Sequence, residues 1–204
     1  MRRSMAVPPS HPMARQVSEF TPRPGTWADE GGIPGLYRAV AMQPGGIARS
    51  YDETDGEYIH GLLSLGLSSG IILVVDHPQK NNALVGEIHA HRGRLQVFTH
   101  VLGELTVAVH PEFQGRGIGR GLFRVLLDEV QSAHPEILRV ELFARESNAR
   151  AIALYESLGF VKEGRFGQRV ATNGTYIADI PMAWFNPAFR RATGPVSPPP
   201  PTAL

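Results

Sequence analysis

The amino-acid sequence predicts an α/β domain whose sheet contains strands of mixed direction. Patterns typical of strands and of amphipathic helices alternate along the middle of the chain, and the alternation ends in a hairpin. The 17 prolines are unevenly placed, with six in residues 1–34, six in residues 187–204 and five between. We therefore expect a disordered or extended segment at 1–34, one domain at 35–186 and a disordered Pro-rich tail at 187–204.

The first half of this domain alternates between strand and helix patterns. Leu36–Met42 is a short candidate strand, and Glu57–Leu67 carries apolar side chains at helical spacing. Ile71–Val75 is an uninterrupted apolar run with β-branched residues, which favours a buried strand. Ala83–Ala90 and Leu95–Val101 lie on either side of a glycine-containing turn, so we expect them to form a hairpin.

The second half contains the strongest helix. Glu104–Val109 is a candidate strand, and Leu138–Phe143 is the next one. Between them lies an amphipathic helix that Pro135 closes, with an apolar face formed by Ile118, Leu122, Val125, Leu126, Val130 and Ala133.

A further helix and a hairpin complete the domain. Ser147 or Asn148 caps a helix that ends at Gly159, a residue suited to a left-handed C-terminal cap. Strands at Val161–Phe166 and Tyr176–Trp184 follow, joined by an Asn-Gly turn. Strands that alternate with helices and finish in a hairpin indicate a sheet of mixed direction.

The composition excludes several classes of function. The chain has no cysteine, which rules out disulfides, thiolate metal sites and a catalytic thiol. Its net charge is +1 with both signs interspersed, so it lacks the basic footprint of a nucleic-acid-binding protein. No apolar run reaches a membrane-spanning length, and we expect a cytoplasmic protein without membrane contact. His89 and His91 would face one side of a strand, but without a third ligand no metal is expected.

The segment Gln114–Gly121 is rich in glycine and lies between a predicted strand and a predicted helix. Glycine lets the backbone approach a ligand closely, and a helix N-terminus offers free N–H groups with a positive partial charge. Arg116 and Arg120 add charged donors. The segment therefore suits a phosphate or pyrophosphate, with a turn that binds nothing as the alternative. It has neither the Gly-Lys-Ser/Thr of a phosphate loop nor the spacing of a dinucleotide fingerprint.

Two motifs together make the sequence resemble the GNAT family of N-acetyltransferases. Gln114, Gly117 and Gly119 match the acyl-CoA-binding motif Gln/Arg-x-x-Gly-x-Gly/Ala. Residues 147–160 are similar to the second signature of the family, Asn-x-x-Ala-x-x-Leu-Tyr-x-x-x-Gly-Phe. The resemblance covers residues 35–186 and implies the GNAT fold, a mixed and mostly antiparallel central sheet with two splayed parallel strands, flanked by helices.

The resemblance also implies acetyl-CoA as co-substrate, lying between the strands Glu104–Val109 and Leu138–Phe143. Asn148 would bond to the pantetheine arm or its neighbours, and Tyr155 would protonate the departing thiolate. The structural alternatives are an N-cap for Asn148 and a core tyrosine for Tyr155. The other implied contacts are the strand residues Val107, Ala108 and Val109, which would pair with the pantetheine arm, and the pyrophosphate-binding residues Gln114, Gly115, Arg116, Gly117, Ile118, Gly119 and Arg120.

The general base is less well specified by the sequence. In relatives that act on protein N-termini, a Glu lies five positions before the Asn of the second motif, where this chain has Phe143. We take Glu104 as the first candidate, followed by Glu87 and Glu141, and a water chain remains an alternative.

The acceptor is equally open. Four acidic residues within six positions would attract a cationic amine such as a polyamine or a lysine side chain. The alternative is a solvated helix start, where acids are favoured. These residues are Asp52, Glu53, Asp55 and Glu57.

We therefore expect an acetyl-CoA-dependent N-acetyltransferase that passes an acetyl group to a primary amine by direct attack in a ternary complex. The amine would belong to a small molecule or to a protein or peptide. The absence of cysteine excludes an acetyl-cysteine intermediate, which favours direct transfer. A homodimer is kept open. The alternative function is a non-catalytic acyl-CoA-binding sensor or assembly module of the same fold.

Overall fold

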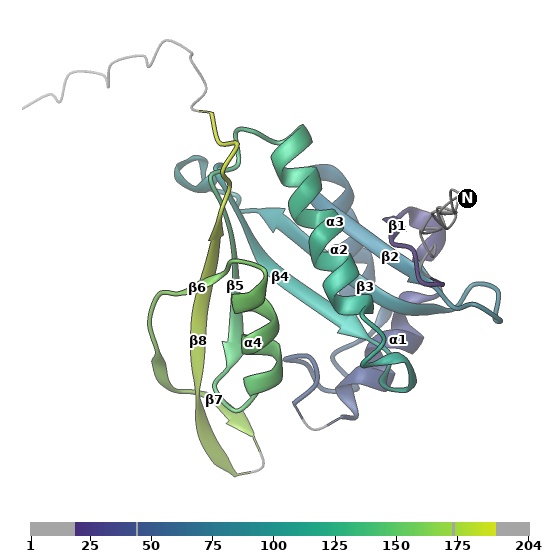
Figure 1. The fold of residues 1–204 in the computed structure, drawn as a ribbon. Coiled ribbons are helices and arrows are strands. Elements are labelled where there is room, and N and C mark those ends of the chain that lie inside the picture. The colour runs from purple at the N-terminus through teal and green to yellow at the C-terminus, as the bar shows by residue number, and fades with distance from the viewer. Residues whose placement is uncertain (1–18, 44, 173, 191–204) are drawn as a thin grey trace, which may run out of the picture.

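The computed structural model of the 204-residue chain describes residues 19–43, 45–172 and 174–190. These residues form one sheet with helices on both faces (Figure 1). The elements in chain order are β1 (Arg23–Pro24), α1 (Ile33–Ala41), α2 (Gly56–Ser69), β2 (Gly70–Asp76), β3 (Leu84–Arg92), β4 (Val101–Val109), α3 (Ile118–Ala133), β5 (Arg139–Arg145), α4 (Ala149–Ser157), β6 (Val161–Lys162), β7 (Phe166–Thr172) and β8 (Thr175–Phe185). Within the described residues, no helix has the length and apolar character needed to cross a membrane.

The sheet has the strand order β1-β2-β3-β4-β5-β8-β6, and β7 also pairs with β8. Neighbouring strands are antiparallel except β4 and β5, which are parallel. Those two strands pair only through Val101 with Arg139 and Leu102 with Val140, and then diverge (Figure 1). The predicted α/β fold, a mostly antiparallel sheet with splayed parallel strands, is confirmed.

Two apolar cores lie on opposite faces of the sheet. Along β2, Ile71, Leu73 and Val75 join the core under α3 and α4, whereas Ile72 and Val74 join the core under α1 and α2. Successive side chains of a strand point to opposite faces, so a strand covered on both sides is apolar throughout. This explains the uninterrupted apolar run that the sequence shows at this strand.

The strand expected at Leu36–Met42 is wrong, because these residues belong to helix α1. The buried side chains of this helix follow helical spacing: Ile33, Leu36, Tyr37 and Val40. Pro34 lies in the first turn, where its missing N–H removes no helical hydrogen bond. The sequence interpretation treated this proline as the end of an extended segment and so missed the first turn of the helix.

The described part of the N-terminal segment also differs from the disordered or extended state expected for residues 1–34. Strand β1 pairs with β2, and a 3-10 helix follows at Trp27–Asp29. The Arg23 guanidinium donates to the carboxylates of both Asp29 and Asp76, which ties this segment to β2. The expectations for residues 1–18 and 191–204 lie outside the described residues, and the domain boundaries at 35 and 186 stay predictions.

The hairpin expected from Ala83–Ala90 and Leu95–Val101 has a different second strand. Strand β3 pairs with β4, which begins only at Val101, and a 3-10 helix at Gln96–Phe98 occupies the connection. Leu95 is exposed there, so the apolar pattern of this stretch does not mark a buried strand.

The final hairpin consists of β7 and β8, with Thr172 opposite Thr175. Gly174 adopts a φ of 73°, which fits the turn expected at an Asn-Gly pair, although Asn173 itself lies outside the described residues. The strand expected at Val161–Phe166 is divided between β6 and the first residue of β7.

A buried polar cluster joins α1 to β3 at the apolar core that lies under α1 and α2. The Tyr37 hydroxyl donates to the Glu87 carboxylate at 2.6 Å, and the His89 Nδ1 lies 3.0 Å from the other carboxylate oxygen. Tyr37 and Glu87 are fully buried. Burial and the neighbouring carboxylate raise the pKa of Tyr37 well above its ordinary value. The tyrosine therefore stays a neutral donor to Glu87.

Removing this donor should destabilise the protein. The change Tyr37→Phe keeps the ring but leaves a buried carboxylate with one partner fewer, so we expect the free energy of unfolding to fall by about 1–3 kcal/mol. Tyr51→Phe is the matched control, because that ring is half exposed and the change should stay within about 0.5 kcal/mol. Chemical denaturation followed by circular dichroism measures both variants, and equal stability of the two would contradict the role assigned to Tyr37.

Candidate functional site

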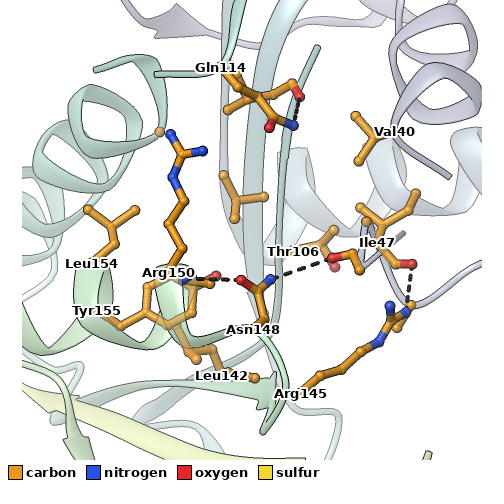
Figure 2. Close-up of a pocket in the computed structure, with 18 of the residues that line it drawn as sticks. Val40, Ile47, Thr106, Gln114, Leu142, Arg145, Asn148, Arg150, Leu154 and Tyr155 are labelled. Carbon is orange, nitrogen blue, oxygen red and sulfur yellow. Dashed lines mark hydrogen bonds between the residues drawn. The ribbon is translucent and has the colours of Figure 1, made fainter. Parts of the chain in front are cut away.

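A cavity with a volume of about 620 Å³ opens where β4 and β5 diverge. Its lining comes from β4, the glycine segment, β5, α4 and the connection between α1 and α2 (Figure 2). Most of the predicted site residues line it: Val107, Val109, Gln114, Gly115, Gly117, Ile118, Gly119, Arg120, Asn148 and Tyr155. The lining does not include Glu104, Ala108 or Arg116.

The glycine segment leads into α3 with an unusual backbone. Gly115 and Gly117 have φ values of 81° and 84°, in the left-handed region that favours glycine. Gly117 is the N-cap of α3, and its carbonyl accepts the first helical hydrogen bond, from Gly121 N at 2.9 Å. The preceding N–H groups of the helix are therefore left without helical acceptors. Such a cluster of donors at a helix N-terminus suits an anionic ligand.

The edge of β4 forms the next part of the wall. Beyond Leu102 this strand has no pairing with β5, so its backbone groups on that side border the cavity. The Gln114 amide donates to the Val109 carbonyl at 3.1 Å, which fixes the glycine segment against the end of β4. The geometry thus gives Gln114 a positioning contact within the protein.

Two residues predicted to bind the cofactor have side chains elsewhere. Ala108 is fully buried in the core beneath α1 and α2, so only its backbone belongs to the β4 edge. The Arg116 guanidinium lies 4.9 Å from the centre of the Phe113 ring and donates to the Glu112 carbonyl. By contrast, Arg120 lines the cavity and donates to the Ser157 hydroxyl at 2.9 Å.

Tyr155 reaches the cavity from α4 (Figure 2). Its ring packs against Phe123 and Phe160 with centroid distances of 5.2 and 6.1 Å. Within the described part of the chain, its hydroxyl makes no hydrogen bond, and the side chain is only 8% exposed. Burial raises the pKa of Tyr155 to about 12, so the hydroxyl keeps its proton at neutral pH. It is a free donor facing the cavity.

Asn148 caps α4 and also contacts the opposite side of the cavity. Its side-chain oxygen accepts from Ala151 N at 3.1 Å, and its amide nitrogen lies 3.5 Å from the Gly45 carbonyl (Figure 2). Nearby, Arg145 donates to the Ile47 carbonyl at 2.9 Å. The two contacts hold the α1–α2 connection against the end of β5 and the start of α4. Asn148 is therefore an N-cap, as the structural alternative expected, and it also lines the cavity.

The three candidate bases have different environments. Glu104 is exposed and has a φ of 50°, near the irregularity in the β3–β4 pairing and two residues before the lining residue Thr106. Glu87 is sealed in the cluster with Tyr37. Glu141 pairs with Arg139 at 3.2 Å. Of the three, only Glu104 combines an accessible carboxylate with the absence of an ion-pair partner among the described residues.

The four acidic residues before and at the start of α2 do not line the cavity. Asp55 is the N-cap of α2 and accepts from Tyr58 N, while Glu53 accepts from the backbone and hydroxyl of Ser50. Asp52 and Glu57 are exposed. The geometry therefore agrees with the helix-start alternative. Among the described residues, no three His, Asp or Glu side chains are grouped to hold a metal ion.

Sequence reasoning did not single out three charged residues of the lining, namely Arg145, Arg150 and Asp179. Arg150 extends from α4 along the cavity (Figure 2), and its guanidinium lies beside Gly115. The position of Arg150 inside the second family motif was the sequence signal that could have identified it as a site residue. Asp179 lies opposite Arg145 across the β5–β8 pair, a neighbourhood that no local pattern reveals.

Comparison with known proteins relates this geometry to a family. Residues 47–160 match the acetyltransferase (GNAT) family. A putative acetyltransferase from Salmonella typhimurium, solved with its cofactor acetyl-CoA, has a TM-score of 0.70 and 22% identity. That match covers 82% of this chain and 94% of the other, and it shows the fold alone.

Two curated relatives share part of the sequence. The ribosomal protein bS18-alanine N-acetyltransferase of Salmonella typhimurium is 52% identical over 63 residues, 29% of this chain and 41% of that protein. Spermidine N(1)-acetyltransferase of Vibrio cholerae is 32% identical over 107 residues, 50% of this chain and 56% of that protein. The chain thus matches about half the length of these relatives, or less. The family match spans more than half of the chain and includes both motifs, and so this protein belongs to the acetyltransferase (GNAT) family.

Proposed function

We propose that the protein is an acetyl-CoA-dependent N-acetyltransferase that transfers the acetyl group directly to a primary amine in a ternary complex. The observation that carries this proposal is the cavity between β4 and β5, which joins a cluster of helix N-terminal N–H groups to a buried tyrosine hydroxyl. The relatives that carry acetyltransferase names support the same reaction class.

The residues of the cavity fit acetyl-CoA. The N–H groups at the start of α3 would hold the pyrophosphate, and the unpaired edge of β4 would accept the pantetheine arm as a strand-like partner. A Cβ on Gly119 would lie 3.7 Å from Val109 and 3.9 Å from Leu154, so the glycine keeps a narrow passage open between the two walls. Arg120 and Arg150 would add charged donors along it.

In the proposed reaction, a neutral amine nitrogen bonds to the thioester carbonyl carbon and the carbon–sulfur bond breaks. Tyr155 would donate its proton toward the departing sulfur, because its raised pKa keeps the hydroxyl protonated. An amine with a pKa near 10.4 is neutral in only about one part in 10³ at pH 7, so its proton must be removed. Glu104 would accept this proton, directly or through water, because its side chain is exposed and it lies two residues before the lining residue Thr106, although Glu104 itself is not part of the lining.

The identity of the acceptor and the cellular location of the protein are also proposals. One relative is named for the alanine of a ribosomal protein and another for spermidine. Both names imply an amine as the acceptor, but the molecule that carries this amine is a protein in one case and a polyamine in the other. We propose a small-molecule or peptide amine, and a cytoplasmic location. The competing function is a non-catalytic acyl-CoA sensor or assembly module, which would bind the thioester without turnover.

An amine panel tests the proposed activity. The purified chain with acetyl-CoA should release CoA thiol in the presence of at least one class among amino acids, peptides and polyamines. A thiol-reactive dye measures release, and calorimetry measures acetyl-CoA binding in parallel. Binding of acetyl-CoA without release by any amine would favour the sensor over the enzyme.

The left-handed backbone at the start of α3 gives a second prediction. Gly117→Ala should cost about 1 kcal/mol of stability, since an L-residue at a φ of 84° is strained, and should weaken acetyl-CoA binding about tenfold. The control Gly61→Ala lies in α2 with open space around its Cβ, so it should keep acetyl-CoA affinity and gain up to about 1 kcal/mol. Calorimetry and denaturation measure both effects. Equal affinity in the two variants would remove the anion-binding role of this turn.

The two proton-transfer roles give a third prediction. Tyr155→Phe and Glu104→Gln should each lower kcat by about 10²-fold, while the Kd of acetyl-CoA changes less than about twofold. Tyr155→Phe keeps the aromatic packing, so a lower rate would report the hydroxyl. Glu57→Gln is the control, as an exposed acid outside the cavity lining. A variant with unchanged kcat would lose its assigned role.

A further inference from the structure

An arginine lies across two aromatic rings beside the part of the cavity that β5, β7 and β8 line. The Arg169 guanidinium is 4.3 Å from the centre of the Phe143 ring and 4.9 Å from that of Phe166. Phe143 lines the cavity, as do Val170 and Asp179 beside it. The two rings are 5.9 Å apart, and both are nearly half exposed. Arg169 itself is not among the lining residues, and it lies beside the cavity through its contact with the lining residue Phe143.

The backbone of β7 departs from regular pairing where it places this side chain. The register moves from Phe166 opposite Asp179 to Val170 opposite Ile177, so the three residues 167–169 face a single residue of β8. Within this bulge Gln168 has a φ of 55°, a strained conformation for a residue other than glycine. Bulges redirect side chains near functional sites. Here the bulge is the local feature that carries Arg169 toward Phe143.

The guanidinium keeps its hydrogen-bonding capacity free. Its nearest carboxylate oxygen belongs to Asp179, 3.9 Å from the Arg169 Nε and beyond hydrogen-bond distance. Among the described residues, no hydrogen bond uses the Arg169 donors, and the side chain is 45% exposed. Stacking fixes the plane of a guanidinium while leaving its edge open to a carboxylate, which it binds in a bidentate way.

The charges around this end of the cavity favour an anionic group. Asp179 lies between two arginines, with Arg145 opposite it on β5 and Arg169 on β7. The neighbouring Glu146 is already paired with Arg165 through two hydrogen bonds. The acidic residues 52, 53, 55 and 57, which would favour a polyamine, lie outside the lining. Two guanidinium groups against one carboxylate leave a positive excess.

We propose that the acceptor is an amine that also carries a carboxylate, and that Arg169 binds this carboxylate while Phe143 and Phe166 support the guanidinium. The inference rests on the proposed acetyltransferase function and narrows its acceptor class. A free amino acid and an acidic peptide segment both offer this chemistry. In this proposal Arg169 is a specificity-determining residue, and the bulge of β7 positions its side chain.

Matched acceptors test the proposal. Thiol release is measured for amino acids and for acidic dipeptides, each against the corresponding carboxamide, with wild type, Arg169→Gln and Arg169→Lys. For the carboxylate form, Arg169→Gln should lower kcat/KM by about 10- to 100-fold, mainly through KM, which is the effect of one lost charged hydrogen bond. Arg169→Lys should retain part of the preference. For the carboxamide form the change should stay below about twofold.

The control is Arg165→Gln in the β6–β7 connection, whose guanidinium pairs with Glu146 away from the cavity lining. It should leave the preference for the carboxylate unchanged. Equal losses for both acceptor forms in Arg169→Gln would reduce Arg169 to a structural role, and a wild-type preference for the carboxamide would overturn the proposal. The wild-type kcat/KM is compared between amino acids and acidic dipeptides, and the higher value shows which of the two is the preferred acceptor.

A binding measurement keeps this test separate from turnover. N-acetylated amino acids and their C-terminal amides are titrated by calorimetry into the protein in the presence of CoA. Wild type should bind the acid about tenfold or more tightly than the amide, and Arg169→Gln should lose that difference. If no amine releases CoA yet this preference is present, the proposed catalysis fails while the carboxylate site stands. If wild type shows no preference, the site itself is refuted.

Discussion

The incomplete pairing of β4 and β5 is the constraint on which the rest of the structure depends. Two residue pairs join the strands, and beyond Leu102 the edge of β4 has no strand partner on that side. Backbone N–H and C=O groups need a partner, so such an edge requires water or a ligand. The N-terminus of α3 and the side chain of Tyr155 border the same opening. One break in the sheet therefore brings together a helix N-terminus with free N–H groups, an unpaired strand edge and a buried tyrosine hydroxyl.

The start of α4 connects the two halves of this opening. Asn148 and Arg145 contact the carbonyls of Gly45 and Ile47, about 100 residues earlier in the chain. The α1–α2 connection is thereby fixed relative to the helix that carries Tyr155. In the proposed ternary complex, positioning two substrates would contribute up to about 7–11 kcal/mol to catalysis, and this link would keep two walls of the cavity in fixed relative positions.

Local sequence patterns predicted those elements in which the spacing of the apolar residues fits only one type of secondary structure. The helix after the glycine segment, the buried strand β2 and the helix capped at Asn148 are all present, because periodicity and capping act within a few residues. The apolar face predicted for the first of these helices is correct only in part, since Val125 and Ala133 are exposed while Phe123 and Leu127 are buried. The prediction of a strand at Leu36–Met42 failed because a stretch this short fits both the alternating spacing of a strand and the spacing of a helix. Burial of the segment against β3 and β4 favours the helix. The strand prediction for Leu95–Val101 failed because Leu95, Val97 and Phe98 are exposed in a connection, and only Val101 belongs to a strand.

The sequence by itself determined the family and the two segments that line much of the cavity, since both motifs are continuous segments whose glycine and capping requirements are local. Only the tertiary structure decided which charged residues lie at the cavity and which are used elsewhere. It placed Glu87 in a sealed cluster with Tyr37, used the acids of the α1–α2 connection for local hydrogen bonds, and brought Arg169 onto Phe143. These neighbours come from different strands and helices, and the register and bulges that align them depend on packing across the whole sheet.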